Sequence, residues 1–240
     1  MIDQNNPLIQ IQAVSKFYQR KNNSIIALDK IDFEINEGEF LALIGQSGSG
    51  KTSILNLIGA LDQPTLGKII FKSNDLGGLS NSKLALFRRE QIGFIFQTFN
   101  LLPALTIVEN VESALIHSKL SQAEVKTKAV NALSQLGLKD KLDSFPSELS
   151  VGQQQKVAIA RALIKNPSVI LADEPLGEMD PIAGKEVLDK LIELNNKLKI
   201  TIIVASHNLT FEKVAQRVIF LSAGKIVLKE QTPYKGKYPQ

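Results

Sequence analysis

The chain has 240 residues, with 28 Lys and Arg against 24 Asp and Glu, and so a formal net charge of +4. Hydrophobic residues make up 44% and charged residues 22%, which excludes a disordered, collagen-like or coiled-coil chain. Because there is no cysteine, disulfides, thiolate nucleophiles and cysteine-bound metals are excluded as well. The weak, scattered basic charge does not favour a nucleic-acid partner, and no apolar run approaches the ~20 residues of a membrane-spanning helix.

Four short apolar runs predict strands that are buried on both faces, as in a parallel sheet covered by helices. Each run ends in a small or polar group: residues 40–44 before a glycine-rich loop, 92–96 before Gln97, 169–172 before Asp173 and Glu174, and 201–205 before Ser206 and His207. Ligands of such sheets bind beyond the carboxyl ends of the strands. We therefore expect these four endings to meet in one site.

The rest of the chain predicts a single domain with two additions to this sheet. Residues of about 8–40 alternate between apolar and polar and predict short antiparallel strands. Residues of about 98–148 are expected to form an inserted helical lobe, and 229–240 a loosely ordered tail. Apolar residues at helical spacing predict four helices, over 49–61, 121–136, 151–165 and 182–198.

Residues 45–52, Gly-Gln-Ser-Gly-Ser-Gly-Lys-Thr, match the phosphate-binding P-loop pattern. Its glycines let successive backbone N–H groups point into one concavity, and the helix that follows adds its positive end. We expect Lys51 to reach the β- and γ-phosphates of a nucleotide and Thr52 to offer its hydroxyl to Mg²⁺. The predicted phosphate-binding residues are Gly45, Gln46, Ser47, Gly48, Ser49, Gly50, Lys51, Thr52 and Ser53. An ordinary strand-to-helix turn is the alternative.

Asp173 and Glu174 end the strand predicted over 169–172 and supply carboxylates for such a site. Because adjacent residues of a strand point to opposite sides, the two carboxylates can have different roles. We expect Asp173 to hold Mg²⁺, directly or through water. Glu174 is expected to orient and deprotonate the water that attacks the γ-phosphate.

The stretch 149–155, Leu-Ser-Val-Gly-Gln-Gln-Gln, is similar to the LSGGQ signature of ABC-type ATPases. Gln97 matches the Q-loop of that family, residues 175–180 its D-loop and His207 its switch histidine. The resemblance runs from about Ile9 to Lys225, with every motif in order. It is greatest with the lipoprotein-releasing, macrolide-exporting and cell-division cassettes, through residues 59–65 (Gly-Ala-Leu-Asp-Gln-Pro-Thr), 93–103 and 146–150.

The resemblance implies an α/β fold: a P-loop ATPase core with a mostly parallel sheet, an N-terminal antiparallel β-subdomain and an inserted α-helical subdomain. It implies ATP and Mg²⁺ as ligands, and two cassettes packed head to tail so that the signature of one completes the P-loop site of the other. Two identical chains are favoured over a heterodimer. A separate transmembrane permease is the implied partner, which places the chain peripherally on the cytoplasmic side of the inner membrane.

The resemblance also implies roles for residues outside the P-loop. Gln97 would touch Mg²⁺ or its water, and His207 would contact the γ-phosphate. Tyr18 stands where these proteins carry an aromatic that stacks on adenine, with Phe17 as a competing candidate. The remaining implied nucleotide contacts are Ser150, Gly152, Gln153 and Asp180. The apolar stretch 98–107 either helps to form the groove for a permease helix or simply packs the lobe.

The signature departs from the family pattern at Val151, which replaces the first of two glycines. A position that needs positive φ suits Val poorly, and one that needs close approach would be crowded by its methyl groups. The alternative is thus a regulatory or weakly hydrolysing subunit that works in a heterodimer. A coiled-coil chromosome ATPase and a two-cassette translation factor are disfavoured, because the chain has neither heptads nor a second cassette.

Overall fold

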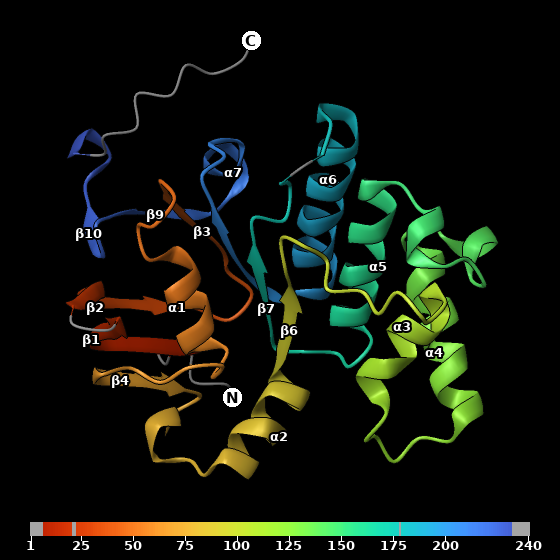
Figure 1. Cartoon of the computed structure of the whole chain (residues 1–240), viewed down its shortest axis with the longest axis horizontal. Coiled ribbons are helices and arrows are strands. Elements are labelled where there is room, and N and C mark those ends of the chain that lie inside the picture. Colours follow the sequence, from red (N-terminus) through yellow and green to blue (C-terminus); the bar gives the residue numbers. More distant parts are fainter. Residues whose placement is uncertain (1–6, 21–22, 178, 232–240) are drawn as a thin grey trace.

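The structure is a computed structural model that describes residues 7–20, 23–177 and 179–231. Its centre is a six-stranded sheet in the order β10-β9-β3-β8-β7-β6 (Figure 1). Five of these strands run parallel, and β10 alone pairs antiparallel at one edge. The bounds are β3 Phe40–Gly45, β6 Ile92–Ile95, β7 Val169–Asp173, β8 Thr201–Ser206, β9 Arg217–Ser222 and β10 Lys225–Val227. The parallel sheet predicted from the four apolar runs is confirmed, and its other two strands were not predicted.

The side chains of the central strands alternate between two apolar cores, one on each face of the sheet. Leu41 and Leu43 of β3 belong to one core, and Ala42 and Ile44 belong to the other. Burial on both faces explains why these strands read as continuous apolar runs.

A second sheet, in the order β2-β1-β4-β5, is antiparallel throughout. Its strands are β1 Ile9–Arg20, β2 Asn23–Ile35, β4 Leu66–Phe71 and β5 Asn74–Asp75. The antiparallel pair predicted within residues 8–40 is confirmed as β1 and β2. The strands β4 and β5 were not predicted, because the first half of β4 is exposed and carries no apolar alternation.

The described part of the chain contains seven α-helices. They are α1 Lys51–Ile58, α2 Asn81–Gln91, α3 Ile107–Glu112, α4 Gln122–Gln135, α5 Val151–Leu163, α6 Pro181–Leu198 and α7 Thr210–Val214. The four predicted helices are present as α1, α4, α5 and α6. The helix predicted over 49–61 is shorter at both ends, because Gly50 is a left-handed N-cap and Ala60 also has a positive φ.

The helices α3 and α4 gather around α5, on the far side of β6 and β7 from the antiparallel sheet (Figure 1). Their buried residues Val111, Ala129 and Leu133 share one core with Val157 of α5. Both helices fall within the stretch 98–148, whose bounds as an inserted lobe stay a prediction. Of the predicted tail, residues 229–231 form a short 3₁₀ helix and 232–240 lie outside the described residues. None of the described helices has the length and apolar character to cross a membrane.

Candidate nucleotide-binding site

The P-loop connects β3 to α1 at the carboxyl end of the central sheet. Gly48 and Gly50 have φ of +78° and +106°, a conformation that residues with side chains rarely adopt. A Cβ at Gly50 would also lie 2.6 Å from the carbonyl oxygen of Ala27, so only glycine fits there. No side chain caps the start of α1 at Gly50. The loop therefore has the backbone form that an anion-binding nest requires.

Lys51 lies buried beneath this loop, with a side chain only 6% exposed. Its Nζ donates to the carbonyl oxygens of Gly45 and Gln46, at 2.9 and 3.0 Å, and lies 4.0 Å from Oε1 of Glu174. Burial lowers the pKa of Lys51, while the carboxylates of Glu174 and Asp173 act to raise it. Ser49, two residues earlier in the loop, is also buried, and its Oγ has no hydrogen-bond partner among the described residues. A buried ammonium and an unsatisfied hydroxyl fit a phosphate group, which would accept hydrogen bonds from both.

Thr52 and Asp173 meet at the start of α1, where the Thr52 hydroxyl donates to Oδ2 of Asp173 at 2.9 Å. Burial raises the pKa of Asp173, the hydrogen bond from Thr52 opposes that shift, and the neighbouring Glu174 charge adds to it. A divalent cation would offset the cost of this buried carboxylate. The pair supplies hard oxygen ligands beside the phosphate nest, and these are the ligands that Mg²⁺ prefers.

Glu174 lies just beyond the end of β7, in a left-handed conformation with φ of +45°. Its backbone nitrogen donates to the Ala205 oxygen at 2.8 Å, which ties this bend to β8. Its Oε2 accepts from the Ser206 hydroxyl at 2.7 Å, and its Oε1 lies 2.9 Å from the backbone nitrogen of His207 and 2.8 Å from Nδ1 of the same residue. The alternation argument made from the sequence is therefore wrong for Glu174, because this residue lies outside the strand. The backbone bend, rather than the pleat, turns it toward Ser206 and His207 at the end of β8.

Comparison with known proteins shows which family this chain resembles. The model of the ABC transporter family matches residues 28–177. The uncharacterized ABC transporter ATP-binding protein YvrO of Bacillus subtilis is 41% identical over 93% of this chain and 97% of its own length. The chain belongs to the ABC transporter ATP-binding family. The alternative of a weakly hydrolysing regulatory subunit is not favoured by these relatives.

Two further comparisons describe the relatives of this cassette. The dimeric structure of the cassette MJ0796 in a post-hydrolysis state, bound to ADP and Pi, has a TM-score of 0.85, with 38% identity over 91% of this chain and 96% of that one. The macrolide export ATP-binding/permease protein MacB of Hyphomonas neptunium is 41% identical over 92% of this chain. The cassette spans only 34% of that MacB, so it corresponds to about a third of the longer protein.

The signature of the cassette caps the helix α5. Ser150 is the N-cap, and it forms a capping box in which its Oγ accepts from the Gln153 nitrogen and the Gln153 side chain accepts from the Ser150 nitrogen. In Figure 1, α5 lies on the other side of β6 and β7 from α1. The signature is therefore not brought to the P-loop of its own chain.

Val151 is the first helical residue of α5, and its φ is not positive. The concern that this position needs a left-handed backbone is thus wrong for the cassette as folded. Val151 is 38% exposed, at the open end of the helix. Gly152 is buried, and a Cβ there would lie 3.0 Å from the Ala183 Cβ, so close helix packing accounts for this glycine.

The other predicted residues of the cassette lie around the sheet edge without joining Thr52. Gln97 is exposed after β6, and its side chain packs near Gly177 of the D-loop. Asp180 caps α6 by accepting from the nitrogens of Ile182 and Ala183. The D-loop residue Glu178 lies outside the described residues.

Two contacts at the site were not predicted from the sequence. The first is the hydroxyl of Ser206 on Glu174, although Ser206 stood in the predicted strand ending. The second is Arg161 of α5, which donates to the oxygens of Phe99 and Asn100 just after Gln97. Burial lowers the pKa of this guanidinium. Both contacts join residues far apart in the chain, and no motif or spacing in the sequence indicates such a contact.

Proposed function

We propose that this cassette is a Mg²⁺-dependent ATPase whose dimer closes on ATP and drives a separate transmembrane permease. The observation that carries the proposal is the grouping of Lys51, the Thr52–Asp173 pair and the Glu174–His207 pair at one edge of the sheet. It provides a phosphate nest, a cation site and a carboxylate in one place.

Each group has a distinct task in this proposal. The backbone of residues 45–50 and the ammonium of Lys51 bind the β- and γ-phosphates. Thr52 and Asp173 would hold Mg²⁺, with Gln97 contributing to its hydration shell; when bound, the ion neutralises charge on the phosphate oxygens. Glu174 takes a proton from the attacking water, and Ser206 and the His207 backbone hold its carboxylate in place. His207 contacts the γ-phosphate.

The second half of each site comes from the signature of another copy of the chain. The separation of α5 from α1 supports this arrangement, because the signature at the start of α5 lies on the other side of β6 and β7 from the P-loop helix (Figure 1). In this proposal Ser150, Gly152, Gln153 and Asp180 contact the nucleotide held by the partner copy. The N-terminus of α5 presents the Ser150 hydroxyl and backbone N–H groups, which suit a γ-phosphate. We propose a homodimer, as in the dimeric structure of MJ0796.

A permease is proposed because MacB joins a related cassette and a permease in one protein. The stretch 98–107 offers a contact: Leu102 is 47% exposed, whereas Ile107 is fully buried in the core. Packing of the lobe therefore accounts for Ile107 and leaves Leu102 for a partner helix. The cassette would then lie on the cytoplasmic side of the membrane, and its work would be export or extraction.

The solution mass of Glu174→Gln, measured by light scattering with and without ATP and Mg²⁺, tests this proposal. We expect a monomer without ATP and a dimer with it, because the variant keeps the phosphate nest but hydrolyses the nucleotide very slowly. ATP binding without dimerisation would point to a non-identical partner. Absence of ATP binding would overturn the proposal.

A further inference from the structure

The turn at residues 59–65, Gly-Ala-Leu-Asp-Gln-Pro-Thr, holds the strand β1 by its polar side chains. Asp62 is central to it: Oδ1 accepts from Nζ of Lys16 at 2.6 Å, and Oδ2 accepts from the hydroxyl of Tyr18 at 3.0 Å. Nζ of Lys16 also donates to the backbone oxygen of Gln63, at 2.8 Å. One carboxylate therefore binds two side chains of β1, which lie 46 and 44 residues away in the sequence.

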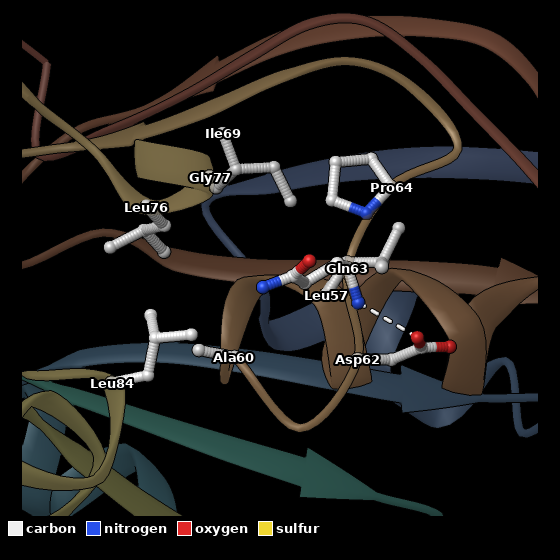
Figure 2. Close-up of a pocket in the computed structure, with 9 residues that line it drawn as sticks. All are labelled: Leu57, Ala60, Asp62, Gln63, Pro64, Ile69, Leu76, Gly77 and Leu84. Carbon is white, nitrogen blue, oxygen red and sulfur yellow. Dashed lines mark hydrogen bonds between the residues drawn. The ribbon is translucent and has the colours of Figure 1, made fainter. Parts of the chain in front are cut away.

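The turn holds Asp62 in one orientation. The backbone nitrogen of Gln63 donates to Oδ1 of Asp62 at 2.7 Å, and Figure 2 shows this bond with the carboxylate directed away from Leu76 and Leu84. Thr65 joins the turn to β1 twice, accepting from the Phe17 nitrogen through Oγ1 and donating through its own nitrogen to the Ser15 oxygen. The hollow under the turn measures about 10 Å³, room for one water at most, so it is no ligand site.

The charge of Asp62 is stabilised by these contacts. Burial acts to raise the pKa of Asp62, but the hydrogen bonds from Lys16, from the Gln63 nitrogen and from Tyr18 outweigh it and hold the pKa below its usual value. The side chain is 31% exposed, so a substitution there does not open the core.

Tyr18 is fixed at its hydroxyl and near one face of its ring. Besides the bond to Asp62, its hydroxyl lies 3.5 Å from Oγ of Ser53, in the first turn of α1. Nζ of Lys16 lies 5.0 Å from the ring centroid, within the range of a cation–π contact. Tyr18 as a whole is 37% exposed, so it lies at the surface beside the P-loop helix.

We propose that Asp62 is a positioning residue, which holds the Tyr18 ring ready as a stacking platform for the adenine of ATP. The inference rests on the proposed nucleotide-binding function. It selects Tyr18 over Phe17, because the side chains of Lys16 and Tyr18 both reach Asp62, whereas Phe17 contacts this turn through its backbone nitrogen, which donates to Thr65. A side chain fixed before binding avoids the entropy cost of ordering it, which strengthens binding of the base alone.

Binding of ADP and of inorganic pyrophosphate, measured by calorimetry, separates a role toward the base from one toward the P-loop. We expect Asp62→Asn to weaken ADP binding about two- to tenfold, the range for one side chain set free, and to leave pyrophosphate binding unchanged. Lys16→Met should have the same pattern. Tyr18→Ala measures how much the whole ring contributes to ADP affinity. Adding Asp62→Asn to Tyr18→Ala should cause no further loss of ADP affinity. Asp75→Asn, a carboxylate that caps an exposed turn, is the matched control.

Three outcomes would overturn the inference. Asp62→Asn that binds ADP as tightly as the wild type would remove any role for its carboxylate. Equal losses for ADP and pyrophosphate would show a structural effect on the P-loop. Tyr18→Ala with an unchanged ratio of ADP to pyrophosphate affinity would show that the ring does not meet the base. Wild-type protein that binds neither ligand would instead overturn the proposed function itself.

Discussion

One carboxylate oxygen of Glu174, Oε1, contacts His207 twice: it lies 2.9 Å from the backbone nitrogen and 2.8 Å from Nδ1 of the histidine. The two residues follow neighbouring strands, β7 and β8, whose register brings their ends together. The Nδ1 contact orients the ring and directs Nε2 away from the carboxylate, while the side chain stays 60% exposed. The pair is thus arranged so that the carboxylate is held and the ring can meet a phosphate.

Replacing Glu174 by Gln should reduce ATP turnover by a factor on the order of 10²–10⁴, the usual contribution of a general base. Nucleotide affinity should stay close to that of the wild type, because the amide keeps its size and can still accept from Ser206. Turnover and ATP binding are measured on the same preparation. Glu90→Gln, an exposed carboxylate paired with Arg89, is the control. Equal turnover by wild type and Glu174→Gln would refute the role of Glu174.

Replacing Asp173 by Asn should raise the Mg²⁺ concentration needed for half-maximal ATP binding by about tenfold or more, a loss of about 1.4 kcal/mol. The reason is that the Asp173 carboxylate, which pairs with the Thr52 hydroxyl in the proposed cation site, loses its charge. Without Mg²⁺, ATP should bind at least as tightly as to the wild type, since a negative charge near the phosphates has been removed. Titrations in the Glu174→Gln background avoid hydrolysis. Weaker binding both with and without Mg²⁺ would argue against a cation site.

Replacing Val151 by Gly should leave the fold intact and lower the ATP concentration that dimerises Glu174→Gln. The backbone is already helical at this position, so the cost to folding is at most about 0.5–1 kcal/mol. The gain comes from removing methyl groups at the helix end that would face the partner's nucleotide. Light scattering at graded ATP concentrations measures the shift. An unchanged midpoint would show that the dimer accommodates valine without crowding.

Lys165 predicts a pH dependence of stability. Burial, with the neighbouring Arg161 charge, lowers its pKa from 10.5 to about 8, although Nζ donates to the Arg88 oxygen. Since the folded pKa is below the unfolded one, the charged lysine costs stability below pH 8, and that cost is relieved between pH 8 and 10.5. Relative to Lys165→Met, the unfolding free energy of the wild type should therefore rise across this range by about 1–3 kcal/mol, allowing for partial exposure. Urea denaturation of both proteins at several pH values measures this difference, and parallel curves would contradict it.

The parallel core and most of the P-loop could be predicted from the sequence, because both depend on local rules. Strands buried on two faces need continuous apolar residues, and Gly50 must be glycine where φ reaches +106°. The polar endings were likewise predictable, since parallel strands bring their carboxyl ends to one edge. The strand β4 was not, because its exposed first half leaves no apolar pattern.

Only the tertiary structure decided which groups touch. Glu174 has a positive φ, although residues other than glycine prefer a negative one. The hydrogen bonds of its backbone to Ala205 and of its carboxylate to Ser206 offset the cost of this conformation. Asp62 reaches Tyr18 across 44 residues of chain, through a turn whose role no spacing rule describes. Periodicity reports which side of an element is buried, whereas a contact between distant side chains depends on how the elements pack, and that is a property of the whole fold.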